Sequence, residues 1–455
     1  MSISFPKKEK EFNANDISLV ELIEDKRKVA PKRILLLGSG GREAAIAWKI
    51  AQSPRTEQLF IAPGNGGTGC YGTNVPQLNP MDFDGVSSFI SKQHIDLLVC
   101  GPEDPLVHGL VDFLQEKPEH SELLIVGPAE NGARLEGSKD FSKAFMRKHG
   151  IPTATYETFG MEEKEEAEEY LDQLTPPFVL KADGLAAGKG VIICDEREEA
   201  NRALEDLWNG KFGSIGQKVV IEEFLRGIEC SVFVATDGEH YKILPVAKDY
   251  KRIGEGDTGP NTGGMGAVSP VPFADKTFMQ KVEERIVVPT LQGLKEEQIP
   301  YCGFLFIGLM NVEGEPYVIE YNCRMGDPET EVVMLRIASD LVDMLEAMAL
   351  GSLHHYTLEI APQTAACVML VSRGYPGEYQ KGFEITLPAP TEDIKLFHAG
   401  TYCQDDKIVT SGGRVLAISS KGEDLHEALT HCYNTAQQVL FEGKNYRHDI
   451  GKDLQ

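Results

Sequence analysis

The stretch covering residues 178–191 constrains the fold of this chain more than any other. An apolar run ends in Lys181, a glycine-rich segment follows, and a second apolar run begins at Val191. Two apolar runs around a glycine-rich turn are typical of a β-hairpin. Glycines let backbone N–H groups approach an anion, and lysines add positive charge. We therefore predict a hairpin that covers a phosphate group. The alternative is a surface loop that carries incidental lysines.

This segment is not a Walker A phosphate-binding loop. Gly184 and Gly188 enclose three residues, whereas the Walker A loop has four between its glycines. Lys189 is followed by Gly190 instead of Ser or Thr, and a strand-like run follows instead of a helix. A hairpin that carries Lys181 and Lys189 over the phosphate is the better interpretation.

Residues 32–136 have the pattern of a doubly wound α/β domain. Apolar runs alternate with helical segments, which favours a parallel sheet with ligand loops at the carboxyl ends of its strands. The runs span residues 33–37, 59–62, 95–100 and 123–126, and a Gly/Pro loop follows each one. The first of these loops resembles a dinucleotide-binding turn. Glu43 stands where the third glycine belongs, which disfavours a dehydrogenase.

The rest of the chain divides into further predicted segments. Residues 1–31 have mixed charge and are expected to form a poorly ordered extension. Residues 137–357 form the second predicted domain, with a flexible subdomain at about 153–222. Residues 254–266 are glycine-rich and without packing periodicity, which suggests a binding loop. From residue 358 the chain is expected to form a β-rich module.

Glu320 and Asn322 are the candidate metal ligands. They lie two positions apart on a predicted strand, so both side chains point to the same face. Carboxylate and amide oxygens suit Mg²⁺, which binds few protein oxygens together with phosphates. A solvent-facing polar pair is the alternative. The polar residues that follow, Arg324, Asp327 and Glu329, favour a site.

Composition narrows the function further. The formal net charge of −25 argues against nucleic-acid binding but leaves small phosphates open. No two of the nine cysteines have Cys-x-x-Cys spacing, and they are expected to be buried thiols in a reducing compartment. No run approaches the length of a membrane span, so we expect a cytoplasmic protein. The histidines, His354 and His355 included, show no metal-binding spacing and are expected to be solvated or hydrogen-bonded.

Taken together, these motifs resemble those of an ATP-grasp enzyme, and the longer blocks are similar to the phosphoribosylamine–glycine ligase family of purine biosynthesis. The ATP-grasp features are Lys139, the Lys181 hairpin, residues 222–225 and residues 320–322. The family blocks are residues 40–43, 62–65, 181–190, 257–266 and 322–330. The resemblance covers the chain from about residue 32 to its end. It implies a biotin-carboxylase-like N-terminal domain, a central α+β ATP-grasp fold and a C-terminal β-rich module.

The resemblance also implies roles for individual residues. Arg324 and Asp257 would bind glycine and, with Lys181, take part in catalysis, and Glu320 and Asn322 would hold Mg²⁺ or Mn²⁺. The ATP-binding residues would be Lys139, Lys181, Gly188, Lys189, Gly190, Glu222, Glu223, Phe224, Leu225 and Glu229. The phosphoribosylamine-binding residues would be Gly38, Gly40, Gly41, Asn65, Gly66 and Thr68, with Glu103 near the ribose.

The implied reaction joins glycine to 5-phosphoribosylamine through glycyl phosphate and yields glycinamide ribonucleotide, ADP and phosphate. The implied assembly is a monomer. Another ATP-grasp carboxylate–amine ligase, or a non-catalytic nucleotide-binding regulatory protein, is the alternative. Two positions depart from the family pattern. Ala44 stands where the family usually has His, and residues 305–310 lack the acidic metal ligand found in many ATP-grasp enzymes.

Overall fold

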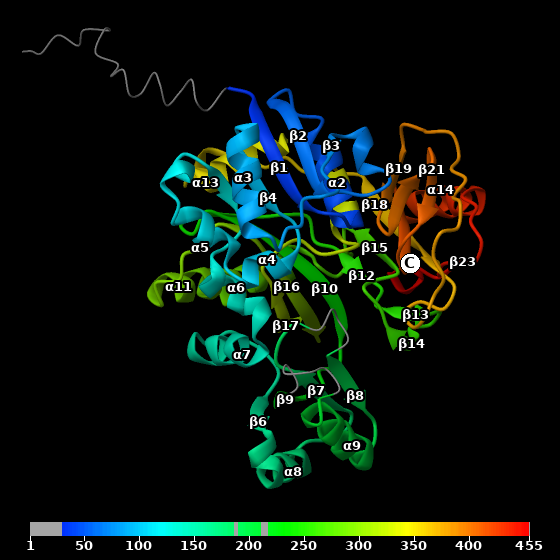
Figure 1. Ribbon diagram of the computed structural model, residues 1–455. Helices are drawn as coiled ribbons and strands as arrows, with labels where there is room; N and C mark the ends of the chain where they lie inside the picture. Colours follow the sequence, from blue (N-terminus) through cyan, green and yellow to red (C-terminus); the bar gives the residue numbers. More distant parts are fainter. Residues whose placement is uncertain (1–29, 186–189, 211–216, 455) are drawn as a thin grey trace, which may run out of the picture.

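The computed structural model describes residues 30–185, 190–210 and 217–454 (Figure 1). Its N-terminal part is a five-stranded parallel sheet with the order β3-β2-β1-β4-β5. The strands are β1 (Lys32–Gly38), β2 (Thr56–Pro63), β3 (Thr73–Asn74), β4 (Leu97–Cys100) and β5 (Leu124–Val126). The helices around them are α2 (Gly41–Ile50), α3 (Phe83–Gln93), α4 (Glu103–Val107), α5 (Leu110–Gln115) and α6 (Glu130–Gly137). The strand order reverses between β1 and β4, where doubly wound sheets bind their ligands.

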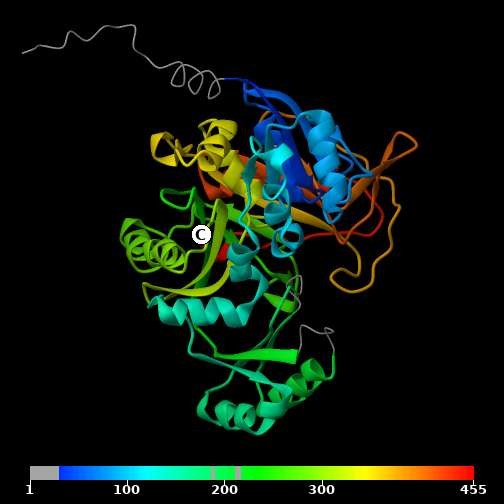
Figure 2. The same ribbon diagram turned by 60° about the vertical axis from the view of Figure 1, so that its left-hand side comes forward.

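A second, smaller sheet carries the predicted hairpin. Its order is β6-β9-β7-β8 and all its pairings are antiparallel. The elements are β6 (Tyr156–Gly160), α8 (Lys164–Gln173), β7 (Phe178–Ala182), β8 (Val191–Cys194), α9 (Arg197–Trp208) and β9 (Lys218–Glu223). They enclose a hydrophobic core of their own. Figures 1 and 2 show this unit projecting from the rest of the molecule, and we call it the lid.

The central sheet, in the order β11-β10-β16-β17, lies between the lid and the N-terminal sheet (Figure 1). Its strands are β10 (Ile228–Thr236), β11 (Tyr241–Ile243), β16 (Gly303–Val312) and β17 (Glu315–Asn322), and all are antiparallel. The helices α7 (Lys139–Lys148), α10 (Lys276–Val282) and α11 (Val288–Glu296) belong to the same part of the chain. A π-helical turn, Glu283–Val287, joins α10 to α11.

The C-terminal sheet is antiparallel and takes strands from two parts of the sequence. Its strand order is β12-β15-β18-β22-β19, and β23 pairs with the last two residues of β18. The elements are β12 (Lys248–Asp249), β15 (Gly266–Ser269), β18 (Thr364–Ser372), β19 (Ile394–His398), β22 (Arg414–Gly422), α14 (Leu425–Gln438) and β23 (Lys444–Asn445). A hairpin of β20 (Thr401–Gln404) and β21 (Lys407–Thr410) lies beside it. Because β12 and β15 precede residue 358, the C-terminal module shares its sheet with the central region.

The glycine-rich stretch at 254–266 contains local order that its composition did not suggest. The short strands β13 (Arg252–Gly254) and β14 (Thr258–Asn261) pair as a hairpin. Further along, α12 (Thr330–Arg336) and α13 (Leu341–Ala349) pack into one large core with α2 and the C-terminal sheet.

Within the described residues, no helix is long and apolar enough to cross a membrane. The parallel N-terminal sheet, the antiparallel sheets of the centre and lid, and the antiparallel C-terminal sheet agree with the predicted α/β multi-domain fold.

Candidate active site

A buried carboxylate holds the hairpin lysine in place. The ammonium group of Lys181, on β7, lies 2.9 Å from the Glu222 carboxylate and donates to the Ile319 carbonyl at 3.1 Å. Lys143 approaches the other oxygen of Glu222 at 3.1 Å. All three side chains are almost fully buried, so these ion pairs are shielded from solvent. The Glu222 side chain therefore positions Lys181.

The segment after Glu222 connects two sheets. Strand β9 ends at Glu223 and β10 begins at Ile228, so residues 224–227 join the lid to the central sheet. The Glu223 carboxylate accepts hydrogen bonds from the backbone and hydroxyl of Thr155, at 2.8 and 2.9 Å. Phe224 and Leu225 are half-buried at this junction. Their predicted contact with adenine stays a prediction.

Lys139 ties helix α7 to the turn after β7. Its ammonium group donates to the Gly184 carbonyl at 2.8 Å, and Asp183 accepts from the hydroxyl of Ser138 at 3.0 Å. Gly190 closes the hairpin, because its carbonyl accepts from the Ala182 amide at 2.9 Å. Gly188 and Lys189, the other predicted ATP ligands of the hairpin, lie outside the described residues.

Glu320 and Asn322 end strand β17 and share one face, as their spacing predicts. Burial by itself would raise the pKa of the Glu320 carboxyl. Ammonium groups outweigh burial and lower that pKa; they belong to Lys251, Lys181 and Lys139. Glu320 is therefore an ionised carboxylate in a positively charged surrounding. Together with an amide oxygen, this donor set fits a divalent metal that also binds phosphate.

Lys251 is a site residue that the sequence analysis missed. It follows β12, and its ammonium group lies 2.8 Å from the carboxylate of Glu229, the predicted ribose ligand. Burial would lower the pKa of Lys251, but the carboxylates of Glu229, Asp249 and Glu320 raise it well above its usual value. Lys251 belongs to none of the motif blocks, and its neighbours in the sequence form no helical or strand pattern that would single it out. No local signal therefore identified it.

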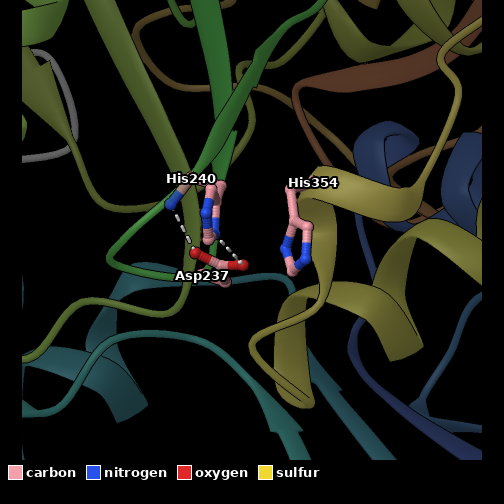
Figure 3. Close-up of side chains that lie close together, drawn as sticks. All are labelled: Asp237, His240 and His354. Atoms are coloured by element: carbon pink, nitrogen blue, oxygen red, sulfur yellow. Dashed lines mark hydrogen bonds and ion pairs between the residues drawn. The ribbon is translucent and has the colours of Figure 1, made fainter. Parts of the chain in front are cut away.

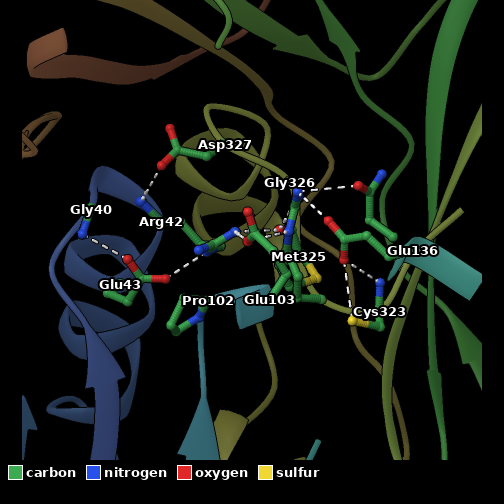
Figure 4. A network of polar contacts seen from close by, with 12 residues as sticks. Gly40, Arg42, Glu43, Pro102, Glu103, Glu136, Cys323, Met325, Gly326 and Asp327 are labelled. Atoms are coloured by element: carbon green, nitrogen blue, oxygen red, sulfur yellow. Dashed lines mark hydrogen bonds and ion pairs between the residues drawn. The ribbon is translucent and has the colours of Figure 1, made fainter. Parts of the chain in front are cut away.

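Arg324 joins the N-terminal domain to β17 through hydrogen bonds to residues of both. Figure 4 labels its partners Glu103 and Glu136 and the neighbouring Cys323. Its guanidinium donates to Glu103 at 3.1 Å, to Glu136 at 2.7 Å and to the Asn322 side-chain oxygen at 3.1 Å. Burial would raise the pKa of Glu103, but Arg324 and Arg42 lower it to about 2. The predicted glycine ligand and the predicted ribose neighbour are therefore an ion pair. Glu136, which the sequence analysis also missed, accepts from the Cys323 amide as well, at 2.8 Å.

Glu43 fills the turn whose glycines the resemblance assigned to phosphoribosylamine. Its carboxylate accepts from the Gly40 amide at 2.7 Å and from the Arg42 side chain at 2.5 Å. Gly38 adopts a φ of +126°, and a Cβ there would lie 2.4 Å from the Glu43 side chain. The residue that breaks the dinucleotide fingerprint therefore caps helix α2 from within the turn. Gly41 is packed against Glu331 in the same way.

The second predicted substrate loop is held together by Asn65. Its side-chain oxygen accepts from the amides of Gly67 and Thr68, at 2.9 and 3.1 Å. Its amide group donates to the carbonyls of Ser39 and His398, at 2.9 and 2.7 Å. Asn65 thus connects both N-terminal loops to the C-terminal sheet. The Gly66 amide adds a 3.1 Å hydrogen bond to the Thr401 carbonyl. Direct contact of these residues with phosphoribosylamine stays a prediction.

Two further positions that the sequence analysis discussed are Asp257, a predicted glycine ligand, and Ala44, where the family usually has His. Asp257 lies between β13 and β14 at a φ of +54°, and its carboxylate accepts from Arg447 at 2.7 Å. Among the described residues, no hydrogen bond or ion pair joins Asp257 to Arg324. Its contact with glycine stays a prediction. Ala44 is fully buried against the core shared with α12, so this position packs and offers no polar group.

Comparisons with known proteins agree with this architecture. Three family profiles match consecutive regions: the phosphoribosylglycinamide synthetase N domain over residues 32–136, its ATP-grasp (A) domain over 137–330 and its C domain over 365–453. The phosphoribosylamine–glycine ligase of Salmonella typhi is 46% identical over 427 residues, which are 92% of this chain and 98% of the relative. The corresponding protein of Ralstonia nicotianae is 44% identical over 424 residues, again 92% and 98%.

Solved structures give the same result. The crystal structure of phosphoribosylamine–glycine ligase from Thermotoga maritima matches with a TM-score of 0.80 and 39% identity, over 92% of this chain and 99% of that chain. A biotin carboxylase from Campylobacter jejuni matches with a TM-score of 0.70 at 13% identity, over 91% and 93%, and shares the fold alone. The resemblance seen in the sequence is confirmed, and the chain belongs to the phosphoribosylamine–glycine ligase family of ATP-grasp enzymes.

Proposed function

We propose that this protein uses ATP to join glycine to 5-phosphoribosylamine, through glycyl phosphate, at the site around Glu320. One observation carries the proposal: ammonium groups from three separate elements surround the ionised Glu320 carboxylate. Lys139 comes from α7, Lys181 from the lid strand β7 and Lys251 from the segment after β12. This arrangement suits a triphosphate with its metal, because positive charge converges where negative charge is transferred.

The metal is Mg²⁺ in this proposal, with Mn²⁺ as the alternative, and Glu320 and Asn322 would hold it. When bound, the cation would neutralise charge on the phosphate oxygens. Lys181 and Lys139 would bind those oxygens directly, and Glu222 would keep Lys181 aimed at them. The junction at Phe224 and Leu225, with Glu229 beside it, would hold the nucleoside.

The chemistry has two steps. A glycine carboxylate oxygen attacks the γ-phosphorus of ATP, and the bond to the bridging oxygen of ADP breaks. The amine nitrogen of phosphoribosylamine then attacks the acyl carbon, the bond from carbon to the phosphate oxygen breaks, and the nitrogen loses a proton. The protein contributes orientation and charge stabilisation, because the amine is already a nucleophile.

Arg324 and Asp257 are proposed to bind the glycine carboxylate and ammonium. Glu103 and the loops at Gly38–Gly41 and Asn65–Thr68 are proposed to form the phosphoribosylamine site. The contacts of Arg324 support this arrangement, because its guanidinium donates both to Glu103 and to Asn322, a proposed metal ligand. The lid, with its own core, would exclude water from the acyl phosphate.

We also propose that the protein acts as a monomer in the cytoplasm. The cysteines support a reducing compartment, because Cys100, Cys230, Cys323, Cys367 and Cys432 are buried thiols without a disulfide in the structure. Size-exclusion chromatography with light scattering tests the monomer, and fractionation of cells with an antibody to the protein tests the location. A stable dimer, or recovery with the membrane fraction, would contradict these statements.

The decisive experiment measures phosphate release with ATP, Mg²⁺, glycine and freshly generated 5-phosphoribosylamine, and omits each in turn. We expect release only when all are present, with glycinamide ribonucleotide as product. Release with a different amine or carboxylate would indicate another ATP-grasp ligase. Tight ATP binding without turnover would instead indicate a regulatory nucleotide-binding protein.

A further inference from the structure

Three side chains that the ligase mechanism does not use converge at the far end of strand β10 (Figure 3). Asp237 and His240 lie in the turn between β10 and β11, and His354 lies in the short 3₁₀ helix η6 (Leu353–His355) after α13. One ligand atom from each lies within 4.8 Å of the others. Asp237 is eight residues from Glu229 along an extended strand, which corresponds to about 26 Å. The cluster is therefore separate from the proposed active site.

The carboxylate of Asp237 is held in a fixed orientation. One oxygen accepts from the backbone amides of Glu239 and His240, at 2.9 and 2.6 Å. The other oxygen accepts from the Leu353 amide at 3.1 Å, which connects the turn to η6. The Asp237 side chain is fully buried, whereas 44% of the His240 side chain is exposed. A buried, oriented carboxylate thus lies beneath solvent-accessible imidazoles.

The imidazoles are arranged around this carboxylate. The His240 Nδ1 atom lies 3.3 Å from the second Asp237 oxygen. Two ligands of a tetrahedral zinc ion with ordinary bond lengths are about 3.4 Å apart, so a metal fits between these atoms with little movement. The His354 ring lies beside the His240 ring, with a centroid separation of 4.3 Å. The third ligand is therefore already close to the first two.

We propose that Asp237, His240 and His354 form a binding site for a divalent transition metal of the zinc class. Two imidazole nitrogens and one carboxylate oxygen suit Zn²⁺, whereas Mg²⁺ prefers oxygen ligands alone. The His355 ring packs on His354 with centroids 3.8 Å apart. Water would complete the coordination of the metal. The site joins two segments that are distant in sequence, so bound metal would clamp the β10–β11 turn to η6.

The sequence analysis expected these histidines to be solvated or hydrogen-bonded. That interpretation used spacing along the chain, and the structure completes the ligand set from a distant segment. A hydrogen-bonded Asp237–His240 pair that binds no metal is the alternative that the experiment must separate.

The test is a zinc titration of the full-length, untagged protein by isothermal titration calorimetry, with saturating Mg²⁺ to occupy oxygen-rich sites. The exposed thiols of Cys70 and Cys403 would compete for zinc, so every protein carries Cys70→Ser and Cys403→Ser. We expect one zinc per chain. His240→Ala and His354→Ala should each weaken binding by at least about tenfold, because loss of even an outer-shell partner has such an effect.

The exposed His426, on α14, supplies the matched control. His426→Ala should bind zinc as the parent does. At the same zinc concentration, zinc should also raise the melting temperature of the parent and of the control more than that of either cluster variant. Unchanged binding in both cluster variants, or no zinc site in the parent, would overturn the proposal. Ligase activity measured without zinc shows that each variant is folded, and it should not change.

Discussion

Replacing Lys181 by methionine separates a phosphate-binding role from a structural one. The methionine side chain keeps most of the volume and removes the charge. In the structure this deletes the 2.9 Å ion pair with Glu222 and one of the ammonium groups that surround Glu320. If Lys181 stabilises charge on the transferring phosphoryl group, turnover should fall by about 10²–10³, which corresponds to roughly 2.7–4 kcal/mol of transition-state stabilisation.

The structure also predicts a smaller loss of stability. Glu222 keeps its second partner, because Lys143 lies 3.1 Å from its other oxygen. We therefore expect the free energy of unfolding to fall by about 1.5–3 kcal/mol, the usual range for one hydrogen bond to a charged group. Lys143→Met is the matched control. It removes the other partner of the same buried carboxylate, and the cations that lower the pKa of Glu320 most are Lys251, Lys181, Lys139 and Arg324.

The assay is ATP-dependent phosphate release with both substrates, combined with urea unfolding of each variant. Lys143→Met should lose similar stability but less than about tenfold in turnover. Lys181→Met should also shift the acid side of the pH–activity profile to higher pH. The reason is that Lys181 lowers the pKa of Glu320, so its removal lets Glu320 bind a proton at higher pH. Near-normal turnover in folded Lys181→Met, or equal loss in both variants, would refute the reasoning.

Three further predictions concern the metal, the Arg324 network and the Asn65 loop. Glu320→Gln should raise the Mg²⁺ concentration needed for half-maximal activity by at least about tenfold, and an unchanged Mg²⁺ titration would exclude Glu320 as a ligand. The pKa of Glu103 is about 2 in the folded protein and ordinarily 4.5, so this carboxylate stabilises the fold above pH 4.5 and loses that effect as the pH falls toward 2. Glu103→Gln should therefore lower the free energy of unfolding by on the order of 3 kcal/mol at pH 7. The free energy of unfolding in urea should also depend less on pH between 4.5 and 2 in the variant than in the wild type. Parallel curves for the two proteins would contradict this. Asn65→Ala, which removes four hydrogen bonds from a buried amide, should lower unfolding stability by about 2–4 kcal/mol, whereas Asn434→Ala on the exposed face of α14 should change it by less than about 0.5 kcal/mol.

Much of the fold could be predicted because its signals are local. A strand, a glycine loop and a second strand specify the β7–β8 hairpin from neighbouring residues. The apolar runs of the N-terminal domain mark strands that are buried on both faces. The shared face of Glu320 and Asn322 follows from the two-residue period of a strand. The sequence also indicated the family, because its longest motif blocks can be recognised without knowing the fold.

Tertiary structure decided which partner each polar side chain meets. In the sequence, Glu43 only marks a mismatch to a glycine motif. The folded turn shows that its carboxylate caps helix α2. Lys251 has no local signature, because its significance arises from the carboxylates that other strands bring to it. In the sequence, Glu136 is likewise only one acidic residue of a helix. Its role becomes visible in the fold, where Arg324 donates a hydrogen bond to its carboxylate.

By itself, then, the sequence indicated most of the helices and strands and the types of reactive group in the site. Periodicity and turn residues act between neighbours, so they can be recognised without coordinates. The fold decided the pairing of Asp257 with Arg447 and the meeting of His240 with His354. Such contacts depend on which faces are buried against each other over long separations along the chain, and no local pattern records that choice.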